Sequence, residues 1–172
     1  MFGNNGSRIA SWLIGFLPMS RCHGLKRWLL SRIGGIEIGD GTCIWSGARF
    51  SGRYIRIGKN CHIGEGCLLA GLTGDAKLEI GDEVSFGPNV FATTGTHYLG
   101  PASRRSGDGR FLPIKIGNGV AVCVNATIMA GATIEDGSVI MPGCVVGGRV
   151  ASNTMVACGK VQRIPIPEKG MQ

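Results

Sequence analysis

The stretch "IGNGVAVCVNATIMAGATIEDGSVIMPGCVV", residues 116–146, decides the fold because an aliphatic residue recurs in it at every sixth position. The same spacing runs through most of the chain before it, with interruptions. An α-helix has a period of about 3.6 residues and an amphipathic strand a period of about two, so neither explains the pattern. The positions of this repeat are Ile38, Ile44, Phe50, Ile57, Ile63, Leu69, Ile80, Phe86, Ile116, Val122, Ile128, Ile134, Ile140 and Val146.

A six-residue unit is typical of a short strand followed by a corner. Such units wind into a prism in which successive coils stack as parallel strands about 4.8 Å apart. The aliphatic residue fills the interior, and glycine, of which the chain has 30, supplies the unusual dihedral angles of the corners. The sequence therefore predicts an all-β parallel solenoid. Four residues after the aliphatic positions the side chain is small or β-branched: Thr42, Ala48, Cys61, Cys67, Val84, Val90, Val120, Ala126, Ala132, Ser138, Cys144 and Val150.

The repeat is interrupted at three places. The phase slips by one residue between Gly52 and Ile55, and "LTGDAK", residues 72–77, has the composition of a small protruding turn. From Ile80 to Ile116 the phase is kept, although residues 98–115 break the apolar pattern. We therefore expect an inserted, exposed loop at residues 97–113, with His97 where the chain leaves the prism.

The segment before the repeat combines aromatic, aliphatic and basic residues. The expected division is an N-terminal amphipathic, helical cap over residues 1–35, the β-helix over 36–163, and a tail over 164–172. Pro18 and Gly24 predict a short helix from about Leu25 to Arg32. One interpretation is that this segment covers the end coil of the solenoid. The alternative is peripheral membrane contact through residues 7–33, since residues 9–17 are too few to span a bilayer.

The charge and the cysteines restrict the partners and the compartment. A net charge of +7 favours anionic partners without choosing among them. Seven cysteines without a framework spacing indicate reduced thiols inside the cell. Cys61, Cys67 and Cys144 occupy the small-residue position, which predicts packing. A zinc site from Cys61, His62 and Cys67 is less favoured because neighbours in a strand point to opposite faces, so we expect no metal.

Two motifs carry a resemblance to a known family: "FGPNVFATTGTH", residues 86–97, and "LPIKIGNGV", residues 112–120. They resemble the maltose, galactoside and xenobiotic O-acetyltransferase branch of the hexapeptide-repeat acyltransferases. Members of that branch carry a histidine, then a loop with an arginine, then Pro-Ile-x-Ile-Gly. The resemblance implies left-handed coils, acetyl-CoA (coenzyme A) as the acyl donor, and a homotrimer with active sites between subunits.

The resemblance also assigns roles to residues of this chain. His97 becomes the general base, a role that one histidine in a polar loop would not indicate by itself. Residues 121–123 (Ala-Val-Cys) replace the branch's usual Trp-Ile-Gly, and residues 159–163 depart from its usual Gly-x-Pro-Ala-Lys. The implied acceptor-binding residues are Tyr98, Arg104 and Arg105. The implied cofactor-binding residues are Ala130, Gly131, Gly143, Gly159, Lys160 and Arg163.

These expectations lead to one function and three alternatives. The function is transfer of an acetyl group from acetyl-CoA to a hydroxyl of a sugar or glycan precursor, including surface polysaccharide, by a cytoplasmic enzyme without a nucleic-acid partner. The first alternative acetylates an antibiotic or an amino sugar. The second is a zinc hydratase resembling γ-carbonic anhydrase, for which only His23, His62 and His97 are available as ligands. The third is a non-catalytic β-helix scaffold. A location at the inner face of the membrane would follow if residues 7–33 bind lipid.

Overall fold

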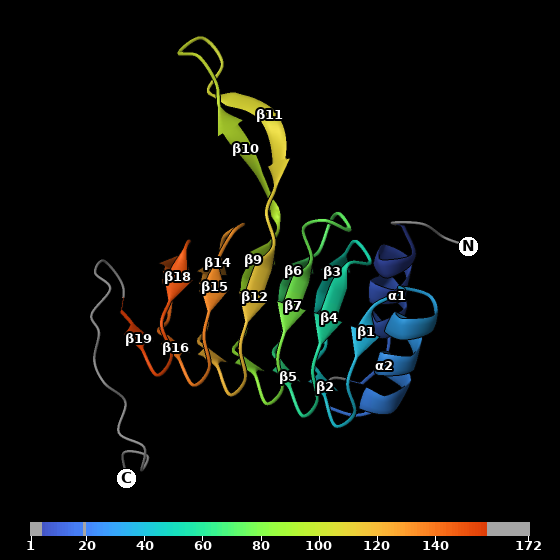
Figure 1. Cartoon of the computed structure of the whole chain (residues 1–172). Coiled ribbons are helices and arrows are strands. Elements are labelled where there is room, and N and C mark those ends of the chain that lie inside the picture. The colour runs from blue at the N-terminus through green and yellow to red at the C-terminus, as the bar shows by residue number, and fades with distance from the viewer. Residues whose placement is uncertain (1–4, 19, 158–172) are drawn as a thin grey trace.

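The chain folds as the predicted left-handed parallel β-helix, with two helices at one end and a hairpin projecting from its side (Figure 1). The computed structural model describes residues 5–18 and 20–157. Three parallel sheets form the sides of the prism. The division of the chain at residues 35 and 163 stays a prediction, and residue 163 lies outside the described residues.

The strands are short and follow one another from side to side. Sheet A contains β1 (Glu37–Ile38), β4 (Ile55–Ile57), β7 (Leu78–Ile80), β12 (Ile114–Ile116), β15 (Thr133–Ile134) and β18 (Arg149–Val150). Sheet B contains β2 (Cys43–Ile44), β5 (His62–Ile63), β8 (Ser85–Phe86), β13 (Ala121–Val122), β16 (Val139–Ile140) and β19 (Met155–Val156). Sheet C contains β3 (Arg49–Ser51), β6 (Leu68–Ala70), β9 (Phe91–Thr93), β14 (Thr127–Ile128) and β17 (Val145–Val146).

The register confirms the six-residue repeat and corrects it at one place. Ile116 pairs with both Ile80 and Ile134, so the phase survives the insertion as predicted. Val150, assigned from the sequence to the small-residue position, instead pairs with Ile134 and is buried in the interior row. The reason is that Gly147 and Gly148 alone connect β17 to β18, which shortens this corner by two residues.

Most corners contain one residue in the left-handed region. We call the corner between sheets A and B the first corner, that between B and C the second, and that between C and A the third. Left-handed φ angles are tolerated by glycine and to a lesser degree by asparagine, which explains the composition of the corners. Glu83 has a φ of 57° at such a position, although it is neither glycine nor asparagine. The residues concerned at the first corner are Gly41, Asn60, Glu83, Gly119, Gly137 and Asn153, and at the second Gly47, Gly66, Asn89, Asn125 and Gly143.

Two corner glycines, Gly119 and Gly52, give a matched stability test. Gly119 has a φ of 62° and open space where a Cβ would stand, so Gly119→Ala should cost about 1 kcal/mol for the dihedral angle alone. Gly52, at the third corner, has a φ of 79°, and its Cβ would collide with the carbonyl oxygen of Gly71. Gly52→Ala should therefore cost about 2 kcal/mol or more. Urea unfolding of both variants measures the difference, and equal costs would show that the close approach is immaterial.

The buried thiols pack as predicted and also donate weak hydrogen bonds between coils. The Cys61 Sγ donates to the Gly81 carbonyl at 3.1 Å, and the Cys67 Sγ to the Gly87 carbonyl at 3.2 Å. The Thr42 hydroxyl occupies the same position in its corner and donates to the Gly58 carbonyl at 2.8 Å. Burial raises the pKa of the Cys67 thiol to about 11, so this thiol stays protonated at neutral pH. These residues hold neighbouring coils together.

The N-terminal cap consists of two helices, α1 (Gly6–Gly15) and α2 (His23–Arg32), which lie side by side against the first coil (Figure 1). The prediction of a single helix from Leu25 was incomplete. Gly24 lies inside α2, which begins at His23, and α1 was not predicted at all. Ala10 and Ile14 of α1 and Leu30 of α2 are buried in the continuous core. The cap interpretation is therefore confirmed.

Polar side chains of the cap bind the open backbone edge of the first coil. An uncovered strand edge presents unpaired N–H and C=O groups. The Phe50 amide donates to the Ser11 hydroxyl at 2.8 Å, and the Ile44 amide donates to Nδ1 of His23 at 3.2 Å. Lys26, whose side chain is fully buried, donates to the Ile44 carbonyl at 3.0 Å and to the Pro18 carbonyl at 2.9 Å. Lys26 is therefore part of the interior of the cap, not of a basic surface.

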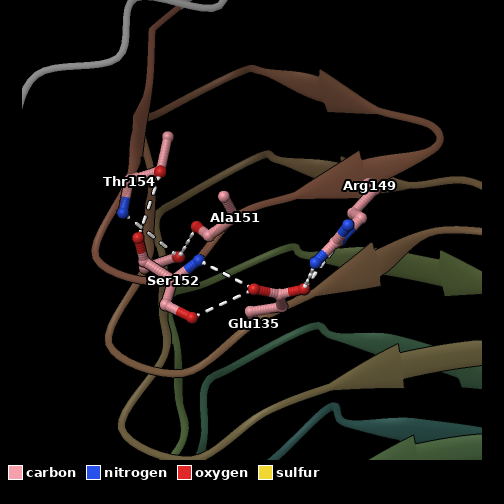
Figure 2. A network of polar contacts seen from close by, with 6 residues as sticks. Glu135, Arg149, Ala151, Ser152 and Thr154 are labelled. Atoms are coloured by element: carbon pink, nitrogen blue, oxygen red, sulfur yellow. Dashed lines mark hydrogen bonds and ion pairs between the residues drawn. The ribbon is translucent and has the colours of Figure 1, made fainter.

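The last described coil is fastened by a polar network centred on Glu135 (Figure 2). One carboxylate oxygen accepts from Nε of Arg149 at 2.7 Å, and the other accepts from the backbone amide and the hydroxyl of Ser152 at 3.1 and 3.0 Å. Hydrogen bonds from Arg149, and then from Ser152, hold the pKa of the Glu135 carboxyl below its ordinary value. The Ser138 hydroxyl continues the network by donating to the Ala151 carbonyl at 2.9 Å.

Candidate active site

The predicted loop is a β-hairpin made of β10 (Gly95–Leu99) and β11 (Ser106–Phe111), and it projects from the third corner (Figure 1). Its base is closed where the Leu112 amide donates to the Thr94 carbonyl at 2.9 Å. His97 lies on β10, opposite Gly109 of β11, and its side chain is exposed. The strand therefore presents the imidazole outside the prism on a short, backbone-paired support.

The three predicted acceptor-binding residues also lie on the hairpin and are exposed. The Arg110 guanidinium lies over the ring of Tyr98 at 5.1 Å, a cation–π contact that fixes the ring on the hairpin surface. Arg105 donates to the Gly100 carbonyl at 3.4 Å, near the tip. Arg104 donates its amide to the Pro101 carbonyl within the same turn. The hairpin thus brings His97 and these side chains onto one projecting element.

The predicted cofactor-binding residues do not form one site within the described chain. Ala130 and Gly131 lie at the third corner, and Gly143 lies at the second. A Cβ on Gly131 would lie 3.2 Å from the Leu112 side chain, so this glycine is needed at the base of the hairpin whether or not a ligand binds. The remaining three, Gly159, Lys160 and Arg163, lie outside the described residues.

A pocket that sequence reasoning missed lies at the second corner, on the first coils of the solenoid. It has a volume of about 310 Å³ and is lined by residues that include Trp45, His62, Glu65, Ser85 and Pro88. The rings of Trp45 and His62 are 5.4 Å apart and tilted by 55°. A half-buried indole beside hydroxyl and carboxylate groups has the chemistry of a sugar-binding site, since the ring covers C–H groups and the polar atoms bind hydroxyls. Trp45 was the only sequence signal, because it is a large ring in a repeat built from small residues.

A larger pocket of about 600 Å³ lies at the first corner and has unsuitable charge for a phosphate-bearing ligand. Its lining includes four carboxylates, those of Glu79, Asp82, Glu135 and Asp136, against the cations Arg56 and Lys115. Several of these carboxylates are also engaged in holding coils together, as Asp82 does by accepting the Lys59 amide at 2.7 Å. In the described residues, no group of three or more His, Cys, Asp or Glu side chains could hold a metal ion.

Comparison with known proteins agrees with the fold and the motifs. No protein-family model matches the chain. The galactoside O-acetyltransferase of Escherichia coli K12 is 33% identical over 107 residues, which are 60% of this chain and 53% of that protein. The crystal structure of a maltose O-acetyltransferase from Clostridium difficile 630 superposes with a TM-score of 0.69 and 26% identity, over 88% of this chain and 79% of that one. The structure of a hexapeptide-repeat acetyltransferase from Vibrio cholerae O1 biovar eltor, complexed with acetyl-CoA, superposes with a TM-score of 0.68 and 25% identity. The superposition covers 87% of this chain and 80% of that one.

These likenesses, together with the register of the coils, show the left-handed β-helix fold and make the chain similar to hexapeptide-repeat acetyltransferases. Among these proteins it is similar to galactoside and maltose O-acetyltransferases, as the motifs around His97 indicated. The chain spans about half or less of the length of the curated relatives it matches, with 39%, 53% and 49% of those proteins covered. In the described residues no helix is long and apolar enough to cross a membrane.

Proposed function

We propose that the protein is a CoA-dependent O-acetyltransferase that moves an acetyl group to a hydroxyl of a sugar or glycan precursor. The observation that carries the proposal is the exposed His97 on a hairpin anchored to the prism, in a chain similar to galactoside and maltose O-acetyltransferases. Bound acetyl-CoA supplies a thioester carbonyl as the electrophile. The imidazole of His97 accepts the proton of the acceptor hydroxyl as the new C–O bond forms, and donates a proton to the departing sulfur.

We propose that the acceptor binds in the second-corner pocket beside Trp45 and His62. A sugar ring laid against the indole would place its hydroxyls within reach of the Glu65 carboxylate and the Ser85 hydroxyl. The lining contains none of the hairpin residues. The hairpin leaves the prism after β9, at the third corner, whereas the pocket lies before β9, at the second. His97 and the pocket therefore need a second subunit to meet.

A homotrimer with active sites between subunits is the assembly we propose. The outward residues of sheet A are mostly charged, with Glu37, Arg56, Glu79, Lys115 and Arg149 on successive strands. The outward residues of sheet B carry no acidic or basic side chain apart from His62, which makes this side the more suitable for subunit contact. The residues concerned on sheet B are Cys43, His62, Ser85, Ala121, Val139 and Met155.

Mixing a His97 variant with a Trp45 variant, assayed at an acceptor concentration well below KM, tests the reaction and the assembly together. His97→Ala removes the base, and Trp45→Ala, which should raise the KM for the acceptor about tenfold, weakens the pocket. If one site takes His97 from one subunit and Trp45 from its neighbour, co-refolded trimers should regain about a quarter of the wild-type sites. Acetyl transfer to sugars, measured by mass spectrometry, gives the readout. Asp75→Ala, in an exposed turn, is the control variant.

Three results would count against these proposals. If the acetyl-transfer activity of the mixture never exceeds the summed activities of the separate variants, the two residues do not meet across a subunit boundary. A Trp45→Ala protein with unchanged KM would remove the pocket from acceptor binding. Absence of any thermal stabilisation by acetyl-CoA would favour a non-catalytic scaffold, because a ligand that binds only the native state must stabilise it. We place the enzyme in the cytoplasm because acetyl-CoA and reduced thiols occur there.

A further inference from the structure

The outer surface of the cap is apolar, aromatic and free of acidic side chains. Packing against the solenoid uses the inner faces of α1 and α2, through Ala10, Ile14 and Leu30. Of the ten large apolar side chains that are exposed in the described residues, five lie on this cap: Ile9, Trp12, Phe16, Leu25 and Trp28. We call these five, together with the exposed Arg8, Arg21 and Arg32, the cap surface.

The aromatic residues of α1 form an outward pair. Trp12 is 65% exposed and Phe16 is 72% exposed, although their rings contact each other edge to face with centroids 4.8 Å apart. A spacing of four residues places them one turn apart on the same side of the helix. Neither ring is required to hold the cap in place, because the edge of the first coil is bound by Ser11, His23 and Lys26. The pair is therefore free to contact something outside the chain.

The charge of the cap surface distinguishes between two possible partners, a second copy of the chain and a membrane. Residues 1–36 contain five of the chain's basic residues and no Asp or Glu, and they account for five of its seven net positive charges. Lys26 is buried inside the cap and Arg27 donates to the Thr42 carbonyl at 3.0 Å, which leaves Arg8, Arg21 and Arg32 to act outward. A second copy of the same end would bring like charges together, which is unfavourable. An anionic phospholipid surface instead offers phosphate groups to the arginines and an apolar interior to the rings.

We propose that the cap surface docks the protein on anionic phospholipid membranes, with α1 and α2 lying in the plane of the headgroups. Each helix has ten residues, too few to span a bilayer, so a bound cap would lie in the interface. Trp12 and Phe16 enter the boundary between headgroups and acyl chains, and Arg8, Arg21 and Arg32 contact lipid phosphates. The solenoid then stands on the membrane by its N-terminal end, with the hairpin projecting from its side (Figure 1). This docking is independent of acetyl transfer.

Co-sedimentation of the full chain with vesicles tests the proposal without an activity assay. We expect binding to phosphatidylcholine vesicles that contain phosphatidylglycerol and weak binding to phosphatidylcholine alone. The double variant Trp12→Ser, Phe16→Ser should bind about tenfold more weakly. The triple variant Arg8→Gln, Arg21→Gln, Arg32→Gln should lose the preference for anionic lipid and its sensitivity to salt. Met129→Ser, Val145→Ser removes two exposed apolar side chains elsewhere and should leave binding unchanged.

Fluorescence of a single tryptophan reports how deeply the cap enters the bilayer. A protein that keeps Trp12 and carries Trp28→Phe and Trp45→Phe should shift to shorter wavelength on anionic vesicles and be quenched by brominated acyl chains. Circular dichroism and thermal melting verify that each variant is folded. Lack of binding to anionic vesicles, or binding that survives the Trp12→Ser, Phe16→Ser exchange, would overturn the proposal. Lipid-independent self-association that the same exchange abolishes would assign the surface to a second copy and overturn it equally.

Discussion

Replacement of His97 by alanine is expected to lower kcat/KM for acetyl transfer about a thousandfold while leaving the thermal midpoint unchanged. The loss is large because a sugar hydroxyl is a poor nucleophile until a base takes its proton. The stability effect is small because the side chain is exposed on β10 and the hairpin is held by backbone pairing. Steady-state kinetics with acetyl-CoA and an identified acceptor, beside differential scanning calorimetry, measure both quantities.

Ser103→Ala, at the exposed tip of the same hairpin, is the matched control and should retain activity. An equal loss in both variants would point to a hairpin that is merely disturbed. A His97→Ala enzyme with kcat/KM within a few-fold of wild type would remove the general-base role. An unchanged thermal shift with acetyl-CoA in the variant would show that donor binding is intact, and the defect would then lie in the chemical step.

Lys26→Met should destabilise the protein by about 2 kcal/mol, although methionine nearly matches the length of lysine. The substitution removes the donor that serves the carbonyls of the buried Ile44 and of Pro18, at 3.0 and 2.9 Å, and leaves them without that partner. Urea unfolding monitored by circular dichroism gives the difference. Lys77→Met, at an exposed position, is the control and should change stability by less than about 0.5 kcal/mol. Equal effects of the two substitutions would contradict the role of Lys26.

Lys26 also makes the free energy of unfolding depend on pH, with a sign that follows from its lowered pKa. Burial lowers the pKa of the Lys26 ammonium below its ordinary value of 10.5, which the unfolded chain keeps. Between the lowered pKa and 10.5, the unfolded state binds more protons than the native state, so the free energy of unfolding rises with pH. Below that window both states are protonated and this dependence vanishes. Comparing wild type with Lys26→Met across the window isolates the contribution, and a constant difference would contradict it.

The solenoid was predictable because its interior repeats, whereas only one helix of the cap was predicted and α1 was missed. Residues such as Ile116 and Ile134 occupy equivalent environments in successive coils, so the period is visible in the chain. Helix α1 has no such signal, since Ser11 and Ile14 are selected by the particular edge that they cover. The corner of only two residues, Gly147 and Gly148, was missed for a related reason. It changes the position of Val150 in the repeat, and a buried valine fits both the interior row and the small-residue position.

The candidate site was predictable only in part. His97 was identified by the motifs on either side of the hairpin, and the structure shows it exposed on a defined strand. The pocket beside Trp45 and His62 depends on contacts between coils about twenty residues apart, which no local pattern encodes. His62 was weighed only as a zinc ligand. The roles of Tyr98, Arg104 and Arg105 stay predictions, as does the binding of the donor by residues 130–163.

The closed base of the hairpin makes the insertion an exchangeable unit. Thr94 and Leu112 are joined by one backbone hydrogen bond, and the coils before and after them keep the register that they would have without residues 95–111. A different hairpin, longer or shorter, can therefore be substituted at this position at little cost to folding. Such an exchange would replace Tyr98, Arg104 and Arg105, the residues predicted to contact the acceptor, and would leave the coils of the prism unchanged.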